Sequence, residues 1–131
     1  MSKAFCLLNH KLTQNQINEL KNKFSIKEIL YPEKELSVKW SQIPAIEELS
    51  MDVICSVVKW LSSAQENDVL IIQGEFGSTF MIVDYALKNK LIPVHAVTKR
   101  VAKESREGET VHREYIFEHV CFRKYKYFEK K

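Results

Sequence analysis

The sequence predicts an α/β fold, a three-layer sandwich in which helices cover a mainly parallel sheet that ends in a C-terminal β-hairpin. Short apolar runs typical of strands alternate with amphipathic segments typical of helices along most of the chain. The run Asp68–Gln73 (DVLIIQ) has consecutive apolar residues, as in a strand buried on both faces of a parallel sheet. At 131 residues, of which 45% are hydrophobic and 28% charged, the chain fits one domain spanning residues 1–131.

The first thirty residues predict a strand, a helix and a second strand. The apolar run Ala4–Leu8 is typical of a buried strand. Thr13 followed by Gln16 has the spacing of a capping box, which predicts a helix from about Gln14 to Lys23. Ile26–Leu30 is again apolar and predicts the second strand.

A loop and two further helices are predicted in the middle of the chain. The stretch Glu33–Ser50 is polar and turn-rich, so it is predicted to be a connecting segment, with Trp40 in the core. Apolar residues at helical spacing predict a helix from about Met51 to Leu61. After the strand DVLIIQ, the segment Gly74–Thr79 leads into a helix that ends near Asn89.

The last third of the chain predicts a strand and a hairpin. Ile92–Val97 is an apolar run typical of a strand, and Arg106–Glu109 has the composition of a turn. Thr110–Val120 is rich in β-branched and aromatic residues, so a hairpin closes the fold.

The formal net charge of +3 is unevenly distributed. Four basic residues and one acid lie between Lys99 and Arg106, and five basic residues and one acid lie between Arg123 and Lys131. A local positive field suits an anionic partner, although a solvated charged edge has the same composition. The pI near 8.7 is too modest for bulk duplex binding, so we expect no duplex DNA partner.

The cysteines and the apolar runs indicate the compartment. Cys6, Cys55 and Cys121 are odd in number and far apart, which does not fit a disulfide framework. The apolar runs are too short to cross a membrane, and the apolar run at the N-terminus is too short for the hydrophobic region of a signal peptide. We therefore expect a cytoplasmic protein with no membrane partner.

The segment Gln73–Thr79 (QGEFGST) is the most informative local feature. Gly74 and Gly77 follow a buried strand and precede a helix, so they let the backbone turn sharply and bring free N–H groups to the helix N-terminus. The hydroxyls of Ser78 and Thr79 lie in the first helical turn, where a phosphate or ribose could bind. The alternative is a tight strand–helix turn capped by Ser78. As a binding site, the segment would supply Gln73, Gly74, Phe76, Gly77, Ser78 and Thr79.

Two further groups of polar residues are expected at the same edge of the sheet. Asn9 and His10 leave the first strand there, and they face the glycine segment if the first and third strands are neighbours. His10 is then a candidate base or a hydrogen-bond donor to phosphate; alternatively, Asn9 and His10 only cap the next helix. Thr98, Lys99 and Arg100 end another strand at this edge, with Thr98 and Arg100 on one face and Lys99 on the other.

The histidines do not have the pattern of a metal site. His10 and His95 are isolated, whereas His112 and His119 are seven residues apart and lie on opposite faces of a regular strand. We therefore expect no metal and no cofactor. Arg106–His112 and Arg113–His119 match an R-x5-H pattern, but the first straddles a turn and the second lies on a predicted strand, which is typical of chance matches. A ribonuclease that acts on linear RNA through Arg113 and His119 is the further alternative.

Three motifs taken together are more specific than any one of them. The chain has L-x-H-x-L-T-x-x-Q at residues 8–16 and D-x-L-I-I-Q-G-x-F-G-x-T at 68–79. It then has A-V-T-K-R-V at 96–101 and F-x-H-V-x-F-R at 117–123. In these motifs and in length, the chain resembles the small stand-alone ring nucleases associated with type III CRISPR systems. These nucleases are single-domain relatives of the CRISPR-associated Rossmann-fold (CARF) sensors.

The resemblance implies a single Rossmann-like CARF domain and a homodimer that binds a cyclic oligoadenylate, usually the tetra-adenylate, across its two-fold axis. The ring is cut without metal to linear di-adenylates with a 2′,3′-cyclic phosphate, which switches off the antiviral signal. The ribose 2′-OH attacks its own adjacent phosphate, so the protein mainly aligns that oxygen and stabilises charge. A sensor or sink that holds the ring without cutting it needs the same residues, and it stays an alternative.

The resemblance also implies roles for individual residues. Backbone N–H groups of Gly74–Thr79 and the side chains of Lys99 and Arg100 suit the charge of the phosphate. His10 is the candidate base, or a donor to the leaving 5′-oxygen. Glu75 is a weaker candidate base, because a carboxylate beside a phosphate is repelled. The remaining candidates for ligand contact are Asn9, Gln73, Phe76, Thr98 and Arg123.

Overall fold

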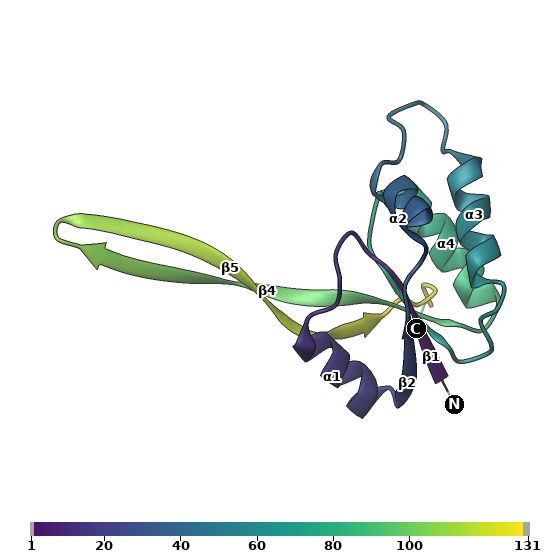
Figure 1. Cartoon of the computed structure of the whole chain (residues 1–131), viewed down its shortest axis with the longest axis horizontal. Coiled ribbons are helices and arrows are strands. Elements are labelled where there is room, and N and C mark those ends of the chain that lie inside the picture. The colour runs from purple at the N-terminus through teal and green to yellow at the C-terminus, as the bar shows by residue number, and fades with distance from the viewer. Residues whose placement is uncertain (1, 130–131) are drawn as a thin grey trace.

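A computed structural model describes residues 2–129, which build a five-stranded sheet of order β2-β1-β3-β4-β5 (Figure 1). The strands are β1 Ser2–Leu7, β2 Ile26–Leu30, β3 Val69–Ile72, β4 Ile92–Glu107 and β5 Thr110–Lys124. The first four strands are parallel, and β5 pairs antiparallel with β4. The predicted α/β class, the mainly parallel sheet and the C-terminal hairpin are therefore confirmed.

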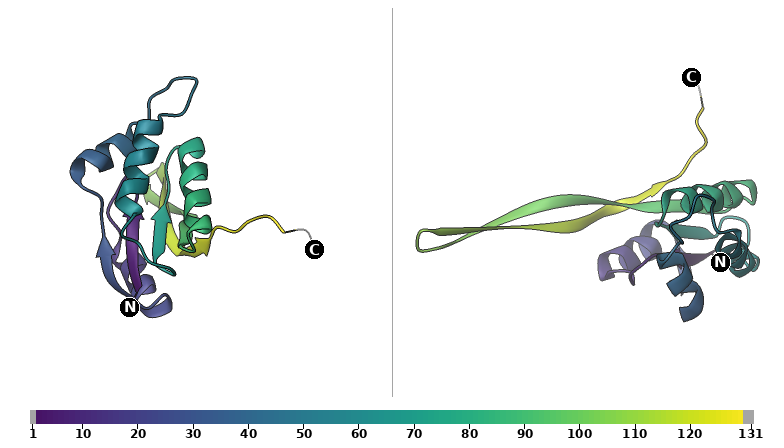
Figure 2. Two further views of the ribbon diagram at one scale, coloured as in Figure 1. Left: turned by 90° about the vertical axis from the view of Figure 1, so that its right-hand side faces the viewer. Right: turned by 90° about the horizontal axis from the view of Figure 1, so that it is seen from above.

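Helices pack on both faces of this sheet (Figure 2). The helices are α1 Gln14–Lys23, α2 Lys34–Ser41, α3 Met51–Leu61 and α4 Phe76–Lys88. Because side chains alternate along a strand, Cys6 of β1 packs in a cluster with Leu20 of α1. Leu7 packs on the other face, in a cluster with Val57 of α3 and Ile82 of α4. None of the helices within residues 2–129 is long and apolar enough to cross a lipid bilayer.

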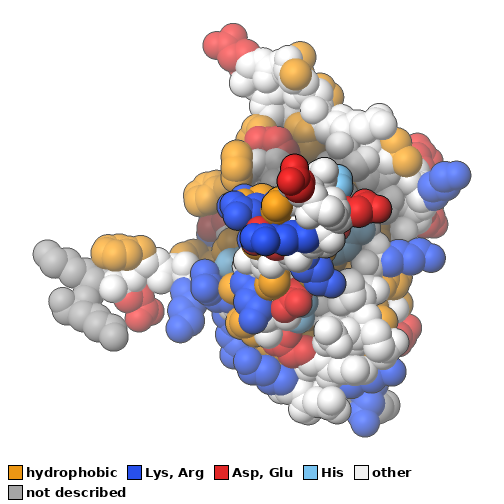
Figure 3. Space-filling view, turned by 90° about the vertical axis from the view of Figure 1, so that its left-hand side faces the viewer, with side chains coloured by type: hydrophobic (Ala, Val, Ile, Leu, Met, Phe, Trp, Pro, Cys, Tyr) orange, Lys and Arg blue, Asp and Glu red, His pale blue; other side chains and the backbone are white. Residues whose placement is uncertain are grey.

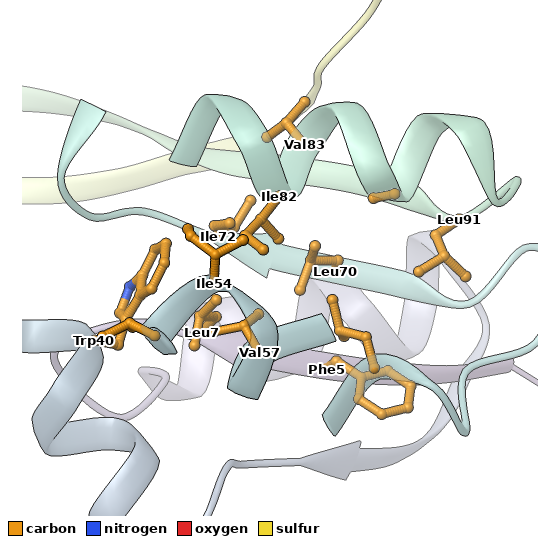
Figure 4. Packing of buried hydrophobic residues seen from close by; sticks show 13 residues of the cluster. Phe5, Leu7, Trp40, Ile54, Val57, Leu70, Ile72, Ile82, Val83 and Leu91 are labelled. Atoms are coloured by element: carbon orange, nitrogen blue, oxygen red, sulfur yellow. The ribbon is translucent and has the colours of Figure 1, made fainter. Parts of the chain in front are cut away.

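Strand β3 is buried on both faces, as its unbroken apolar run predicted. Leu70 and Ile72 belong to the core cluster under α3 and α4, which Figure 4 shows, whereas Val69 and Ile71 belong to the cluster under α1. All four residues are at most 2% exposed. A central strand of this kind fixes the positions of the loops at both of its ends.

The predicted capping box at the start of α1 is confirmed. The Thr13 hydroxyl accepts from the backbone N–H of Gln16 at 3.3 Å, and the Thr13 N–H donates to the Gln16 side chain at 3.0 Å. The helix bounds 14–23 and the strand bounds 26–30 are those that the sequence predicted. Local chemistry is therefore sufficient to position this part of the fold.

The prediction of a continuous loop over residues 33–50 was wrong, because residues 34–41 form α2. Leu36 and Trp40 lie one turn apart and pack on the core under α3 and α4, with Trp40 only 1% exposed. Leu36, Val38 and Trp40 alternate with polar residues, and this spacing does not match a helical period. The burial of Trp40 was predicted correctly.

Strands β4 and β5 run on together beyond the rest of the sheet as a two-stranded arm (Figures 1 and 2). We define the arm as residues 98–119. It closes in a turn at Gly108, where a φ of 62° favours glycine. The strand predicted to end at Val97 thus continues to Glu107. Beyond His119, which contacts α1 at the base of the arm, nearly every arm residue is exposed, so no alternation of apolar and polar residues reveals the strand in the sequence.

Candidate functional site

The carboxyl ends of β1 and β3 meet at one edge of the sheet. Leu7 is level with Ile72, and the N–H of Gln73 donates to the Leu7 carbonyl at 3.2 Å. The first and third strands are therefore neighbours, as the sequence argument required. The order of the sheet reverses here, and ligands of open α/β sheets bind at such a point. We call Asn9, His10, Gln73 and Gly74 the switch point.

Trp40 holds the turn that follows β3. Its indole Nε1 donates to the carbonyl of Gln73 at 3.0 Å. A Cβ atom added at Gly74 would lie 2.7 Å from three atoms of the Trp40 ring. Gly74 is thus needed because a buried tryptophan packs directly against its backbone, a reason that the sequence did not reveal.

Glu75 caps α4 and occupies two of the N–H groups that were expected to bind phosphate. Its carboxylate accepts from the N–H of Gly77 at 2.9 Å and from the N–H of Ser78 at 2.8 Å. It also accepts from the Ser78 hydroxyl at 2.8 Å, and Ser78 is only 1% exposed. These contacts correct the predicted roles. Glu75 serves as the N-cap of α4, and Gly77 and Ser78 have their N–H groups bound within the chain.

The cap gives Glu75 a pH-dependent role in stability. The hydrogen bonds from the N–H groups of Gly77 and then Ser78 hold the pKa of Glu75 below its ordinary value. The stabilisation is therefore complete above that ordinary value and is lost as the pH falls through the lowered pKa. We expect Glu75→Gln to be less stable than the parent in urea at neutral pH, and the difference to shrink in acid. Glu109→Gln in the hairpin turn is the control, and an equal loss there would contradict a capping role.

The first turn of α4 also carries two exposed aromatic side chains. Phe76 is 93% exposed and Phe80 is 73% exposed, and they lie one turn apart on the helix. Phe76 is thus available for ligand contact, as the sequence predicted, whereas Phe80 was missed. The Thr79 hydroxyl oxygen is buried and has no hydrogen-bond partner, so it does not face solvent as a ligand group would.

Thr98, Lys99 and Arg100 lie on the arm, beyond the switch point. Extending the register of β3 and β4 makes Ala96 level with Gln73. At about 3.3 Å per residue, Arg100 then lies about 13 Å farther along the strand. The structure does not bring these basic residues to His10 of the same chain.

The faces of the arm are as predicted. Lys99 pairs with Glu118, with 3.9 Å between the ammonium and the carboxylate. Arg100 lies on the opposite face with Thr98, and its guanidinium is 4.2 Å from the centre of the Tyr115 ring. Arg100 is therefore held by a cation–π contact beside an exposed aromatic surface.

The positive field expected near Lys99–Arg106 is balanced on the arm itself. Residues 98–119 include five basic and five acidic residues. Cross-strand pairing sets Lys103 opposite Glu114, and Arg113 lies 4.0 Å from Glu104. Blue and red side chains are accordingly mixed where the arm points toward the viewer in Figure 3. The later basic run starts at Arg123, and its Lys130 and Lys131 lie outside the described residues.

Arg123 is remote from the switch point. It lies opposite His95 on β5, which is three strands away from β1. Three strand spacings of about 4.8 Å separate them by roughly 14 Å. The structure thus does not bring Arg123 into contact with His10 of the same chain.

His119 is engaged in a packing contact. Its side chain is 7% exposed, and its Nε2 lies 2.6 Å from a carboxylate oxygen of Glu19 on α1. The second Glu19 oxygen accepts from the N–H of Phe122 at 2.8 Å. Arg113 is six residues away along the strand, or about 20 Å. The R-x5-H pair is therefore not assembled as a site, and His112 lies on the opposite face, as predicted.

His10 is exposed at the switch point and has one ring nitrogen engaged. Its Nδ1 lies 2.9 Å from the carbonyl of Lys11. Because a carbonyl can only accept, Nδ1 carries the proton and Nε2 of the neutral ring is free to accept one. A nitrogen of this kind is able to take a proton from a neighbouring hydroxyl.

A pocket of about 480 Å³ adjoins the switch point on the β2 side. The loop after β1, the turn after β2 and the start of α2 form its walls. Its polar lining residues are Asn9, His10, Lys11, Lys34 and Ser37. Tyr31 adds an aromatic surface that is 43% exposed. The sequence argument missed this pocket, although Tyr31 ends its strand at the same edge as Asn9.

Two further kinds of reactive group would extend the chemistry of the switch point, a thiol nucleophile and a cluster of metal-binding side chains. Burial raises the pKa of the Cys6 thiol to about 12, so this thiol stays protonated and is a poor nucleophile. Within residues 2–129, no group of three or more His, Cys, Asp or Glu side chains is placed to hold a metal ion.

Comparison with known proteins identifies a family. The chain is 36% identical over 126 residues to the uncharacterized protein MJ1673 of Methanocaldococcus jannaschii. The alignment covers 95% of this chain and 98% of that protein. No solved structure gives a significant match. Residues 2–123 match the uncharacterized protein MJ1673 family, and the chain therefore belongs to that family.

Proposed function

We propose that the chain is a ring nuclease that binds a cyclic oligoadenylate and cuts it without a metal ion. Cyclic tetra-adenylate is the ring to test first, and its cleavage would switch off type III CRISPR signalling. The observation that carries the proposal is His10, exposed at the switch point with Nε2 free. The proposal also assigns the fold as a Rossmann-like CARF sandwich of three layers, with α1 on one face of the sheet.

The proposed reaction uses the nucleophile that RNA itself carries. The 2′-oxygen forms a bond to the adjacent phosphorus, the bond from phosphorus to the 5′-oxygen breaks, and a 2′,3′-cyclic phosphate results. His10 Nε2 takes the proton from the 2′-OH, and the leaving 5′-oxygen takes a proton from water, to which His10 then returns its own. Two cuts at opposite phosphates convert the tetra-adenylate ring into two linear di-adenylates.

The charge of the phosphate needs cations or N–H groups beyond those of Gly77 and Ser78, because Glu75 binds these two. Lys11 adjoins His10 in the same loop and is exposed. Lys99 and Arg100 lie on an arm that projects beyond the carboxyl edge of the sheet (Figure 1). We propose that Arg100, on the face of the arm that carries Tyr115 and Phe117, acts on the ring held by a second copy of the chain, in a homodimer.

The exposed surface of the arm supports this homodimer. Phe117 is 72% exposed, Tyr115 48% and Val111 49%, and the register puts them on one face with Arg100. A two-stranded hairpin is marginally stable alone in water, so exposed aromatic side chains on such a hairpin favour a covering partner. The balanced charges suit a protein surface better than a nucleic acid. Two copies with their switch points facing across a two-fold axis would lay each arm beside the other.

Phe117→Asp is expected to convert the dimer to a monomer, because it replaces the most exposed aromatic side chain of the covered face with a charge. Light scattering of the parent at tens of micromolar should give twice the mass of the chain. Lys103→Asp, on the opposite face of the arm, is the matched control and should remain dimeric. A parent that is monomeric with and without the ring would contradict the proposed dimer.

The function is tested by incubating the purified chain with cyclic tetra-adenylate in EDTA and resolving the products by chromatography. We expect linear di-adenylate with a 2′,3′-cyclic phosphate. A generic linear RNA is run in parallel and should stay intact. Tight binding of the ring without cleavage would instead identify a sensor or sink, and cleavage of the linear RNA would identify a general ribonuclease.

A further inference from the structure

The pocket beside the switch point has the chemistry of a nucleotide site. Its volume of about 480 Å³ is in the range of small-ligand pockets, which is roughly 300–1,000 Å³. Lys11 and Lys34 stand in its walls together with His10, and no acidic residue lines it. Such a lining favours an anionic ligand.

The remaining lining residues indicate what else the ligand carries. The half-exposed ring of Tyr31, next to Pro32, offers a flat surface on which a base can stack. The side-chain amide of Asn9 offers one donor and one acceptor side by side, which is the pattern that pairs with adenine. Ser37 adds a hydroxyl at the start of α2.

We propose that this pocket binds a single adenine nucleotide, with the base on Tyr31 and beside Asn9, and with the phosphate on Lys11 and Lys34. The pocket is distinct from the segment after β3 that the sequence indicated. Where the inference concerns the ring, it rests on the proposed function: one adenylate of the ring occupies the pocket, and its phosphate lies near His10. Binding of a free mononucleotide does not depend on the ring or on its cleavage.

The test is a titration of the parent chain with 5′-AMP, UMP and inorganic phosphate, followed by amide NMR shifts. We expect 5′-AMP to shift residues 9–11 and 31–37 and to bind at least several-fold more tightly than UMP. Tyr31→Ala should weaken 5′-AMP by about 5- to 100-fold, as for loss of a base–aromatic stack. Tyr31→Phe should retain most of the affinity, and Tyr127→Ala, an exposed tyrosine on the C-terminal segment, should not change it.

Three results would overturn the inference. These are no 5′-AMP binding up to millimolar concentration, equal affinity for inorganic phosphate, and equal affinity of the parent and Tyr31→Ala. The two proposals fail separately. If 5′-AMP binds here but cyclic tetra-adenylate is not cut, the nuclease is rejected and the nucleotide pocket stands. If the ring is cut at the parental rate and affinity by Tyr31→Ala, the nuclease stands and the ring does not use this pocket.

Discussion

His10→Ala is expected to lose about 10²- to 10⁴-fold of the single-turnover rate of ring cleavage, the range for a general base. Its affinity for the ring should stay near that of the parent, because the imidazole acts on a proton in transit and is not a main source of binding. The Lys11 carbonyl orients the ring of His10, so that Nε2 is the nitrogen that reacts. Rates are measured with enzyme in excess over ring, and affinities with a separate binding assay.

His112→Ala is the matched control for this variant, since His112 is exposed near the end of the arm. It should cut at the parental rate. The limb of the pH–rate profile produced by a titrating base should be absent in His10→Ala and present in His112→Ala. Cleavage by His10→Ala at the parental rate would show that His10 is a loop residue with no role in proton transfer. Catalysis would then rest on substrate alignment alone.

Replacing Trp40 should have the largest effect on stability. Trp40→Ala is expected to lower the free energy of unfolding by about 3–5 kcal/mol, because it opens a cavity in the core. Gly74→Ala alone is expected to lower it by about 1–3 kcal/mol, because its Cβ would overlap the indole ring. When the indole is absent, that overlap disappears. The loss of stability caused by Gly74→Ala should therefore fall to near zero in a Trp40→Ala or Trp40→Leu background. Urea unfolding of the parent, the two single variants and the double variant measures this coupling.

Trp60 provides the control for this double-mutant cycle. It contacts the ring of Phe5 edge-on, with 5.3 Å between ring centres, and a Cβ at Gly74 would not meet it. Trp60→Ala should lower stability, but it should leave the cost of Gly74→Ala unchanged. If Gly74→Ala lowers the stability equally in the parent, in Trp40→Ala and in Trp60→Ala, Trp40 does not fix the turn after β3.

The sequence predicted well those elements whose chemistry is local. The capping box at Thr13 and Gln16 determines the start of α1, and the unbroken run Val69–Ile72 determines a strand buried on both faces. The arm and α2 were harder to predict, since both carry few buried apolar residues. Trp40 was expected in the core, but the helix that carries it was not, because one buried residue does not make a period.

The site was predicted only in part, because its contacts join residues far apart in the chain. The loop after β1 and the turn after β3 leave the same edge because their strands are neighbours, an order that sequence patterns suggest but do not fix. The capping by Glu75 is local and could have been foreseen, because an acidic side chain before a helix satisfies its first N–H groups. Lys99 was read as part of a positive field because its partner Glu118 lies on the other strand of the arm.

The most direct test compares cyclic tetra-adenylate with its 2′-deoxy analogue, which keeps the ring, the bases and the phosphates but lacks the nucleophile. Both are incubated with the parent chain in EDTA, and the products are identified by mass spectrometry after binding has been measured. We expect both rings to bind, and only the ribose ring to be opened, to di-adenylate with a 2′,3′-cyclic phosphate. Failure of both rings to bind, or opening of the deoxy ring, would contradict the proposed function and mechanism.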